Sequence, residues 1–297
     1  MKDQKFGIEI EFTGMSRYDA AKLVAKYFGS TAHYAGSVYQ TYEIKDTQGR
    51  TWKVMRDSSV RPETRDGHTA SDDNRCEMVS PICTYEDIET VQEIVRILRR
   101  EGGMRVNNSC GIHVHIDASQ HTARSLKNIA NIMASKEDLL LKALNTEEER
   151  VRRWCQKVDE GFLDRVNKPS IKTMQQVRDS WYNGHDGAHD HYDHTRYHAL
   201  NLHAVWQKGT VEFRCFNSTT HAGKIKAYIQ LCLAISNQAK TQKSASRKKT
   251  VTTNEKFTFR TWLIHLGLNG DEFKTARLHL LANLDGDIAY RNGREAA

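Results

Sequence analysis

Residues 5–12 read Lys5-Phe6-Gly7-Ile8-Glu9-Ile10-Glu11-Phe12, and apolar and polar side chains alternate along them. Alternation with a period of two predicts a β-strand with one buried face. Side chains at positions i and i+2 point to the same face, so Glu9 and Glu11 are expected roughly 7 Å apart. The segment therefore predicts a strand that carries two carboxylates on one face.

Three later segments alternate in the same way, with apolar side chains on one face and chemically reactive side chains on the other. The polar residues on these faces are Glu77 in residues 75–79, His113 and His115 in 110–117, and Glu212 and Arg214 in 210–216. Any one of these faces, taken alone, is more typical of a solvated strand surface. Together they favour a functional site, because exposed strands more often carry Lys, Thr and Ser.

If the four strands pair in one sheet, Glu9, Glu11, Glu77 and Glu212 converge. Clustered carboxylates repel one another unless a cation compensates them. Oxygen ligands with one imidazole suit Mg²⁺ or Mn²⁺ better than structural Zn²⁺. A neighbouring Arg214 would then meet phosphate oxygens. The combination predicts metal-assisted phosphoryl transfer.

The sequence lacks both common glycine-rich signatures for holding phosphates. Neither G-x-x-x-x-G-K-[ST] nor G-x-G-x-x-G occurs among the 297 residues. If the protein uses ATP, we therefore expect metals and cationic side chains to hold the phosphates.

Composition limits the remaining function classes. The net charge of +7 favours anionic partners such as nucleotides. The basic runs at 96–100 and 243–249 are more typical of a helix surface and a linker than of a nucleic-acid groove, so nucleic acid is not the expected partner. We expect a cytoplasmic protein with no membrane partner, because no apolar signal core, membrane-length apolar run or C-x-x-C pair occurs.

Helical patterns separate the strands, which predicts an α+β fold. The expected helices are 17–28, 85–100, 122–158, 171–182, 224–239, 257–266 and 271–281, and the expected hairpins are 38–45 with 51–56 and 197–205 with 210–216. The domain prediction is a catalytic domain at 1–240, a polar basic linker at 241–254 and a C-terminal helical extension at 255–297.

One loop is unusually rich in histidine. It holds His185, His189, His191, His194 and His198, interleaved with Asp186, Asp190 and Asp193. The two interpretations are an auxiliary metal site and a polar active-site loop. Irregular spacing and the absence of cysteine favour the polar loop.

The chain resembles the amidoligase branch of the carboxylate–amine ligases, relatives of glutamine synthetase and glutamate–cysteine ligase. The matching segments, in order, are Gly7-Ile8-Glu9-Ile10-Glu11-Phe12, Asp57-Ser58-Ser59, Cys76-Glu77-Met78-Val79-Ser80-Pro81, Cys110-Gly111-Ile112-His113-Val114-His115, Arg196-Tyr197 to Asn201-Leu202, and Gly209-Thr210-Val211-Glu212-Phe213-Arg214. The resemblance implies a glutamine-synthetase-like curved antiparallel β-sheet that holds ATP and metals, with helices packed on its outer face.

The resemblance also implies metal ligands. Glu11 and Glu77 would bind one ion, and Glu9, His113 and Glu212 would bind a second that is shared with the ATP phosphates. Whether His113 or His115 is the ligand stays open, and motif position favours His113. The implied metal is Mg²⁺, with Mn²⁺ as an alternative.

The remaining implied roles concern substrates. Arg214 would stabilise the transferred γ-phosphoryl group beside Glu212, and Asp57 would hold or deprotonate the incoming amine with Ser59 nearby. The residues implied to contact nucleotide or substrate carboxylate are His115, Arg196 and Asn201.

The implied activity is an ATP-dependent carbon–nitrogen ligase. ATP phosphorylates a small-molecule or peptide carboxylate, and an amine then attacks the acyl phosphate to give an amide. Two alternatives remain. One is phosphate transfer to a guanidino group on the same fold. The other is a non-catalytic nucleic-acid-binding protein, against which the intact Glu, His and Arg set argues.

Overall fold

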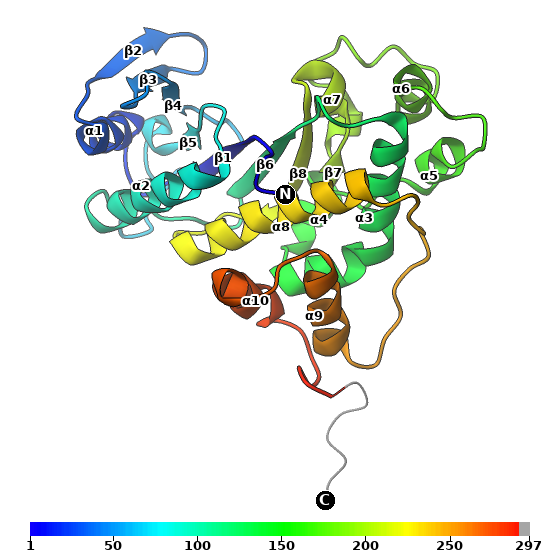
Figure 1. Cartoon of the computed structure of the whole chain (residues 1–297). Coiled ribbons are helices and arrows are strands. Elements are labelled where there is room, and N and C mark those ends of the chain that lie inside the picture. Colours follow the sequence, from blue (N-terminus) through cyan, green and yellow to red (C-terminus); the bar gives the residue numbers. More distant parts are fainter. Residues whose placement is uncertain (291–297) are drawn as a thin grey trace, which may run out of the picture. The chain divides into compact units, whose positions relative to one another are not determined.

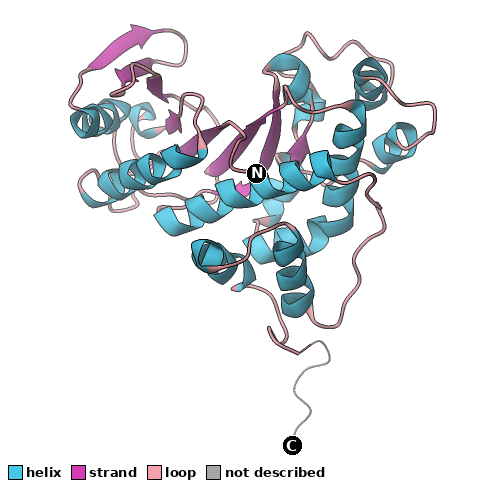
Figure 2. Cartoon of the chain, in the orientation of Figure 1, coloured by secondary structure: helices cyan, strands magenta, loops and turns pink. Residues whose placement is uncertain are grey.

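The computed structural model describes residues 1–290, which fall into two compact units. The N-terminal unit comprises residues 2–114 and 216–226. The C-terminal unit comprises Met1, residues 115–215 and the described residues from 227 to 290. Both units contain strands and helices, as Figure 2 shows, so the α+β prediction is confirmed.

The N-terminal unit is built on antiparallel strands in the order β2-β3-β4-β5-β1, with β6 next to β1. The bounds are β1 Phe6–Phe12, β2 Ala32–Gly36, β3 Thr41–Lys45, β4 Thr51–Met55, β5 Cys76–Val79 and β6 Gly111–Asp117. In β1 the side chains of Phe6, Ile8 and Ile10 are buried, as the alternation predicts.

Two helices accompany these strands. Helix α1 (Arg17–Phe28) begins after Ser16, whose side chain accepts a hydrogen bond from the Asp19 amide, and ends at Gly29 with a φ of 64°. Helix α2 (Ile88–Arg100) buries one apolar face. Helix α1 packs on β3 and β4 and beside α2 (Figure 1). The predicted helix 17–28 is confirmed.

Strand β2 was not predicted. It lies at the edge of the order and pairs only with β3 among the described strands. The side chains of its three central residues, among them Tyr34, are exposed. An edge strand without a buried face has no period-two pattern to detect.

The C-terminal unit pairs β7 (Leu200–Asn201) with β8 (Thr210–Asn217) and surrounds them with helices. The helices are α3 Ala123–Leu144, α4 Glu148–Arg153, α5 Glu160–Val166, α6 Met174–Tyr182, α7 His203–Gln207, α8 Ala222–Thr241 (which begins in the N-terminal unit), α9 Glu255–His265 and α10 Lys274–Leu281. Helix α3 contacts α5, α6 and α10. Within residues 1–290, no helix combines the length and the apolar character needed to cross a membrane.

Two predictions were wrong in this unit. The helix expected at 122–158 ends at Leu144, because Asn145 adopts the left-handed conformation with a φ of 50°. The strand expected at 197–205 is only two residues long, and the helix α7 begins at His203. Apolar residues in a short segment cannot distinguish a strand from one helical turn.

The segment predicted as a linker, residues 241–254, lies against α3. The side-chain amide of Asn131 donates to the Ala245 carbonyl, and the Thr250 amide donates to the Ser135 carbonyl. Lys249 forms a 2.7 Å ion pair with Glu137, which is 1% exposed. The segment thus has fixed contacts, while the domain division itself stays a prediction.

A buried histidine makes this unit sensitive to acid. The His121 ring lies between the hydroxyls of Ser125 and Ser236, at 3.1 and 3.0 Å. Burial, with a smaller effect of Lys240, lowers the pKa of His121 from 6.5 to about 4, and Asp117 opposes the shift. The folded state therefore keeps the imidazole neutral where the unfolded chain binds a proton.

We expect His121 to remove stability as the pH falls from 6.5 towards 4. Because the unfolded state binds more protons in this window, the free energy of unfolding should drop by about 3 kcal/mol through this group. Denaturant unfolding of wild type and His121→Gln at pH 7.5 and 4.5 measures the difference. An equal acid-dependent loss in both proteins would contradict the assignment.

Candidate functional site

Strands β1 and β5 place two carboxylates directly opposite each other in the N-terminal unit. The register pairs Glu11 with Glu77, and their residues are 4% and 8% exposed. Directly opposed side chains have Cβ atoms about 5 Å apart, and like charges there are destabilising. Two buried carboxylates in this register could together hold a cation, which would offset their repulsion.

His113 on β6 lies between the two β1 carboxylates. Its Nδ1 is 3.0 Å from an oxygen of Glu9, and its Nε2 is 3.6 Å from an oxygen of Glu11. The other Glu11 oxygen accepts a 2.6 Å hydrogen bond from the Gly111 amide. Alternation along β1 and β6 thus brings the predicted residues together on facing strands.

The carboxylates and imidazole form two overlapping sets of potential metal ligands. One set is Glu9, Glu77 and His113, and the other is Glu11, Asp57 and Glu77. In each set the ligand atoms lie within 4.8 Å of one another. Predominantly carboxylate donors fit Mg²⁺ or Mn²⁺. We name these five residues the carboxylate cluster.

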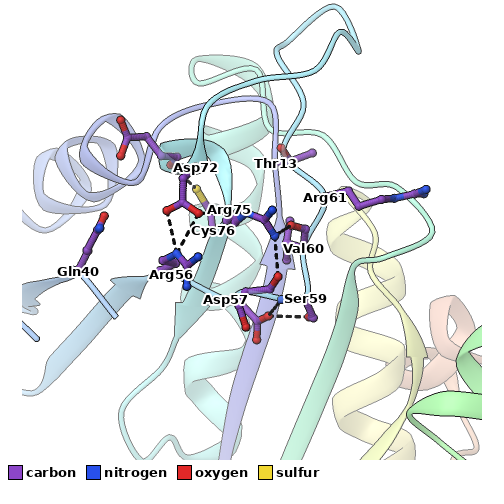
Figure 3. A network of polar contacts seen from close by, with 12 residues as sticks. Thr13, Gln40, Arg56, Asp57, Ser59, Val60, Arg61, Asp72, Arg75 and Cys76 are labelled. Carbon is purple, nitrogen blue, oxygen red and sulfur yellow. Dashed lines mark hydrogen bonds and ion pairs between the residues drawn. The ribbon is translucent and has the colours of Figure 1, made fainter. Parts of the chain in front are cut away.

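Asp57 reaches this cluster from a turn after β4. One Asp57 carboxylate oxygen accepts hydrogen bonds from the amide and the hydroxyl of Ser59, both 2.6 Å (Figure 3). Arg75, just before β5, donates to the carbonyls of Ser58 and Val60, both 2.6 Å. These bonds fix the turn to the start of β5 and hold Asp57 in place.

Arg75 also forms an ion pair with Asp72, and Asp72 is in turn bound by Arg56. The Arg75 Nε lies 3.1 Å from a carboxylate oxygen of Asp72, which also accepts 2.8 and 3.0 Å bonds from Arg56 (Figure 3). The Arg56 side chain lowers the pKa of Asp72, which keeps the ion pair charged. No sequence pattern indicated this support, because Arg56, Asp72 and Arg75 match no motif.

The C-terminal unit holds a second group of predicted residues around Glu212. One Glu212 oxygen accepts a 2.6 Å bond from Arg214, and the other accepts a 2.6 Å bond from the side-chain amide of Asn201. Asn201 and Glu212 are register partners in β7 and β8. All three residues are at most 6% exposed. We name them, together with His115, the Glu212 cluster.

His115 completes this cluster through Thr210. The His115 Nδ1 is 3.0 Å from the Thr210 hydroxyl, and its Nε2 is 3.8 Å from Glu212. His113 belongs to the carboxylate cluster and His115 lies beside Glu212, because the two side chains share a face of β6 but lie two residues apart along the strand and therefore have different neighbours. Which one ligates metal stays a prediction.

Two buried polar atoms near Glu212 have no protein partner within residues 1–290. They are Oδ1 of Asn201 and Nε2 of His203. Burial lowers the pKa of His203, so its Nδ1 can accept from the Tyr182 hydroxyl and its Nε2 then carries the proton. A buried acceptor and a buried donor without protein partners are available to an ordered water or to a polar ligand. The sequence did not single out His203 or Tyr182.

Arg196 has a different environment. It lies in the short helix η3 (His194–Arg196), over the rings of Tyr192 and Tyr197 at 5.5 and 5.8 Å, and donates to the His191 carbonyl. Its predicted contact with nucleotide or substrate carboxylate stays a prediction.

Cysteine chemistry is not supported at these strands. Burial raises the pKa of Cys76, next to Glu77, and of Cys215, next to Arg214, well above the ordinary thiol range. Both thiols stay protonated at neutral pH, so neither is poised as a nucleophile.

Of the comparisons with known proteins, the one with family models gives a match, and this match covers most of the chain. No curated protein matches the sequence. The model of a family described as "Putative amidoligase enzyme" matches residues 2–236, which include every residue of both clusters, and the chain therefore belongs to this amidoligase family.

Proposed function

We propose that the protein is an ATP- and Mg²⁺-dependent ligase that joins a carboxylate to an amine on a glutamine-synthetase-like sheet. Family membership supports a ligase. The observation that carries the metal-dependent part is the buried cross-strand pair Glu11 and Glu77, with Glu9 and His113 within ligand distance. Such a pair is costly without a cation.

In this proposal the carboxylate cluster holds Mg²⁺. Bound Mg²⁺ would neutralise negative charge on the ATP phosphates. Asp57, fixed by Ser59 and Arg75, is positioned by the same turn to hold the incoming amine or accept its proton. Its membership of a ligand set with Glu11 and Glu77 also makes it a candidate ligand.

Arg214 is the proposed donor to the transferred phosphoryl group. Its guanidinium carries five N–H donors in a planar fork, and Glu212 orients it through a 2.6 Å bond. A buried, oriented cation stabilises the charge that develops on the phosphoryl oxygens during transfer. Asn201 Oδ1 and His203 Nε2 are proposed to contact polar substrate atoms.

The reaction then proceeds in two balanced steps. A carboxylate oxygen attacks the γ-phosphorus, the bond to the β-phosphate oxygen breaks, and ADP leaves. The amine nitrogen next attacks the acyl carbon, the acyl–oxygen bond breaks, and phosphate leaves while the nitrogen gives up a proton. A carboxylate is a poor electrophile until it is phosphorylated, and this explains the need for ATP.

We expect a non-hydrolysable ATP analogue to bind only with Mg²⁺. Isothermal titration should show that removing Mg²⁺ lowers the affinity of the wild type for the analogue at least about tenfold. Glu212→Gln should lower the affinity by at least the same factor in the presence of Mg²⁺. Each loss corresponds to about 1.4 kcal/mol or more of binding free energy. No binding by the wild type would contradict the proposal. An affinity for DNA that falls as the salt concentration rises, and that is unchanged in Glu212→Gln, would favour the nucleic-acid alternative.

The ligase reaction is tested by isotope transfer. Purified protein, ATP and Mg²⁺ are incubated with ¹⁸O-labelled carboxylates and a panel of amines. An acyl phosphate moves one labelled oxygen into the released phosphate. Labelled phosphate that requires both substrates supports the ligase, and phosphate that stays on a guanidino acceptor supports the phosphotransferase.

A further inference from the structure

The histidine-rich segment between α6 and η3 is an ordered part of the C-terminal unit. Asp193 accepts hydrogen bonds from the amide and hydroxyl of Thr195, at 2.9 and 2.5 Å. The Trp181 indole donates to the same hydroxyl, and the Gln207 side chain donates to the Ala188 carbonyl. The segment is thus attached at both ends and near its middle.

Within this segment, three side chains of types that can ligate a metal lie close together. His185 Nε2 lies 2.9 Å from one oxygen of Asp193, and His194 Nδ1 lies 4.0 Å from the other. The two imidazole rings stack with centroids 5.5 Å apart and an interplanar angle of 18°. One ligand atom from each residue lies within 4.8 Å of the other two.

These separations suit a single ion. Zinc sits about 2.1 Å from nitrogen and oxygen ligands, which puts tetrahedral ligands about 3.4 Å apart. The two nitrogen–oxygen separations, 2.9 Å from His185 and 4.0 Å from His194, bracket this value, and a rotation of the His194 side chain can shorten the longer one. The His194 side chain is 81% exposed, and apart from its stacking on the His185 ring it is open to solvent, so it can rotate.

We propose that His185, Asp193 and His194 form a binding site for a divalent transition-metal ion such as Zn²⁺. Two imidazole nitrogens and one carboxylate favour zinc over Mg²⁺, which prefers oxygen ligands. Three protein ligands leave a fourth position open to water or another ligand. The exposure of His185 and His194 lets the ion enter from solvent.

The ion would connect the end of α6 to η3. His185 follows α6 closely, whereas Asp193 and His194 begin η3, the helix that carries Arg196. The connection restrains the intervening residues and with them the start of the segment that leads to Asn201. The irregular spacing of the histidines hid this site, because a fold in the loop brings residues 185 and 194 together.

The test is zinc titration of untagged, metal-free protein by calorimetry at pH 7.5. Wild type and His189→Ala should bind one Zn²⁺ equally, because His189 is exposed in the same loop but outside the trio. His194→Ala should bind about a hundredfold more weakly. Because His194 is exposed, this variant should unfold at the wild-type temperature without metal.

The Glu77→Gln variant tests whether Zn²⁺ binds at His185, Asp193 and His194 or at the carboxylate cluster. Retention of the Zn²⁺ site in Glu77→Gln and its loss in His194→Ala support the proposal. Equal Zn²⁺ binding by His194→Ala and wild type would overturn it, as would loss of the site only in Glu77→Gln. Neither result depends on nucleotide binding or ligase activity.

Discussion

Replacing Arg214 with Lys should lower kcat/KM for amide formation by about a hundredfold, and replacing it with Ala should lower kcat/KM by about a thousandfold or more. Lys keeps the charge but lacks the planar fork that Glu212 orients through the 2.6 Å bond. Ala removes the cation and leaves the buried Glu212 carboxylate without its guanidinium partner. The measurement is ADP release that requires both carboxylate and amine.

Arg214→Ala would lose activity if the protein unfolded as well as if a catalytic group were removed, and a control must distinguish the two causes. Loss of one partner of a buried ion pair destabilises a protein by about 3–5 kcal/mol, so Arg214→Ala needs a thermal unfolding control. Arg153→Lys is the matched control, because its side chain is 68% exposed and pairs only with Glu149 among the described ion pairs. A well-folded Arg214→Ala with wild-type kcat/KM would exclude Arg214 from phosphoryl transfer.

Glu77→Gln is expected to lose Mg²⁺ binding and, at the same time, to stabilise the metal-free protein. Glu77 belongs to both ligand sets, so its loss should weaken Mg²⁺ binding about a hundredfold and abolish turnover. Its replacement also removes the repulsion with the opposed Glu11. Wild type should gain about 2.7 kcal/mol of stability at an Mg²⁺ concentration of 100 Kd, and the variant should gain little.

The matched control lies in the same antiparallel strands. Glu43 on β3 faces Lys53 on β4 in the register and lies 3.5 Å from its ammonium. Glu43→Gln should leave the Mg²⁺ response unchanged and should not stabilise the metal-free protein. If Glu77→Gln destabilises the metal-free protein and still responds to Mg²⁺, the carboxylate cluster is not a metal site.

The strand pattern predicted much of the candidate site. Alternation in residues 5–12 and 110–117 correctly placed Glu9 and Glu11 on one strand and His113 on another. These assignments succeed because the side-chain period of a strand is a local property. The boundaries of α1 were predicted correctly for the same reason, because Ser16 and Gly29 are local signals for the start and the end of a helix.

The sequence alone failed where the answer depended on partners. The turn residues Arg56, Asp72 and Arg75 act through contacts with one another, and no pattern marks them. The short helix at His203 was missed because a short apolar segment fits a strand and a helical turn equally well, and the break at Asn145 was missed although a left-handed Asn is a local signal for a helix end. His203 therefore entered the site only through its buried, unpartnered nitrogen.

The amino-acid sequence by itself determined which side chains share a strand face, where the main helices begin, and the family to which residues 2–236 belong. These features follow from local geometry and from the identity of the residues. Only the tertiary structure decided that Glu77 opposes Glu11, that Asn201 donates to Glu212, and that His185 meets His194. Register and loop folding join residues far apart in the chain, and their energies depend on contacts that exist only after folding.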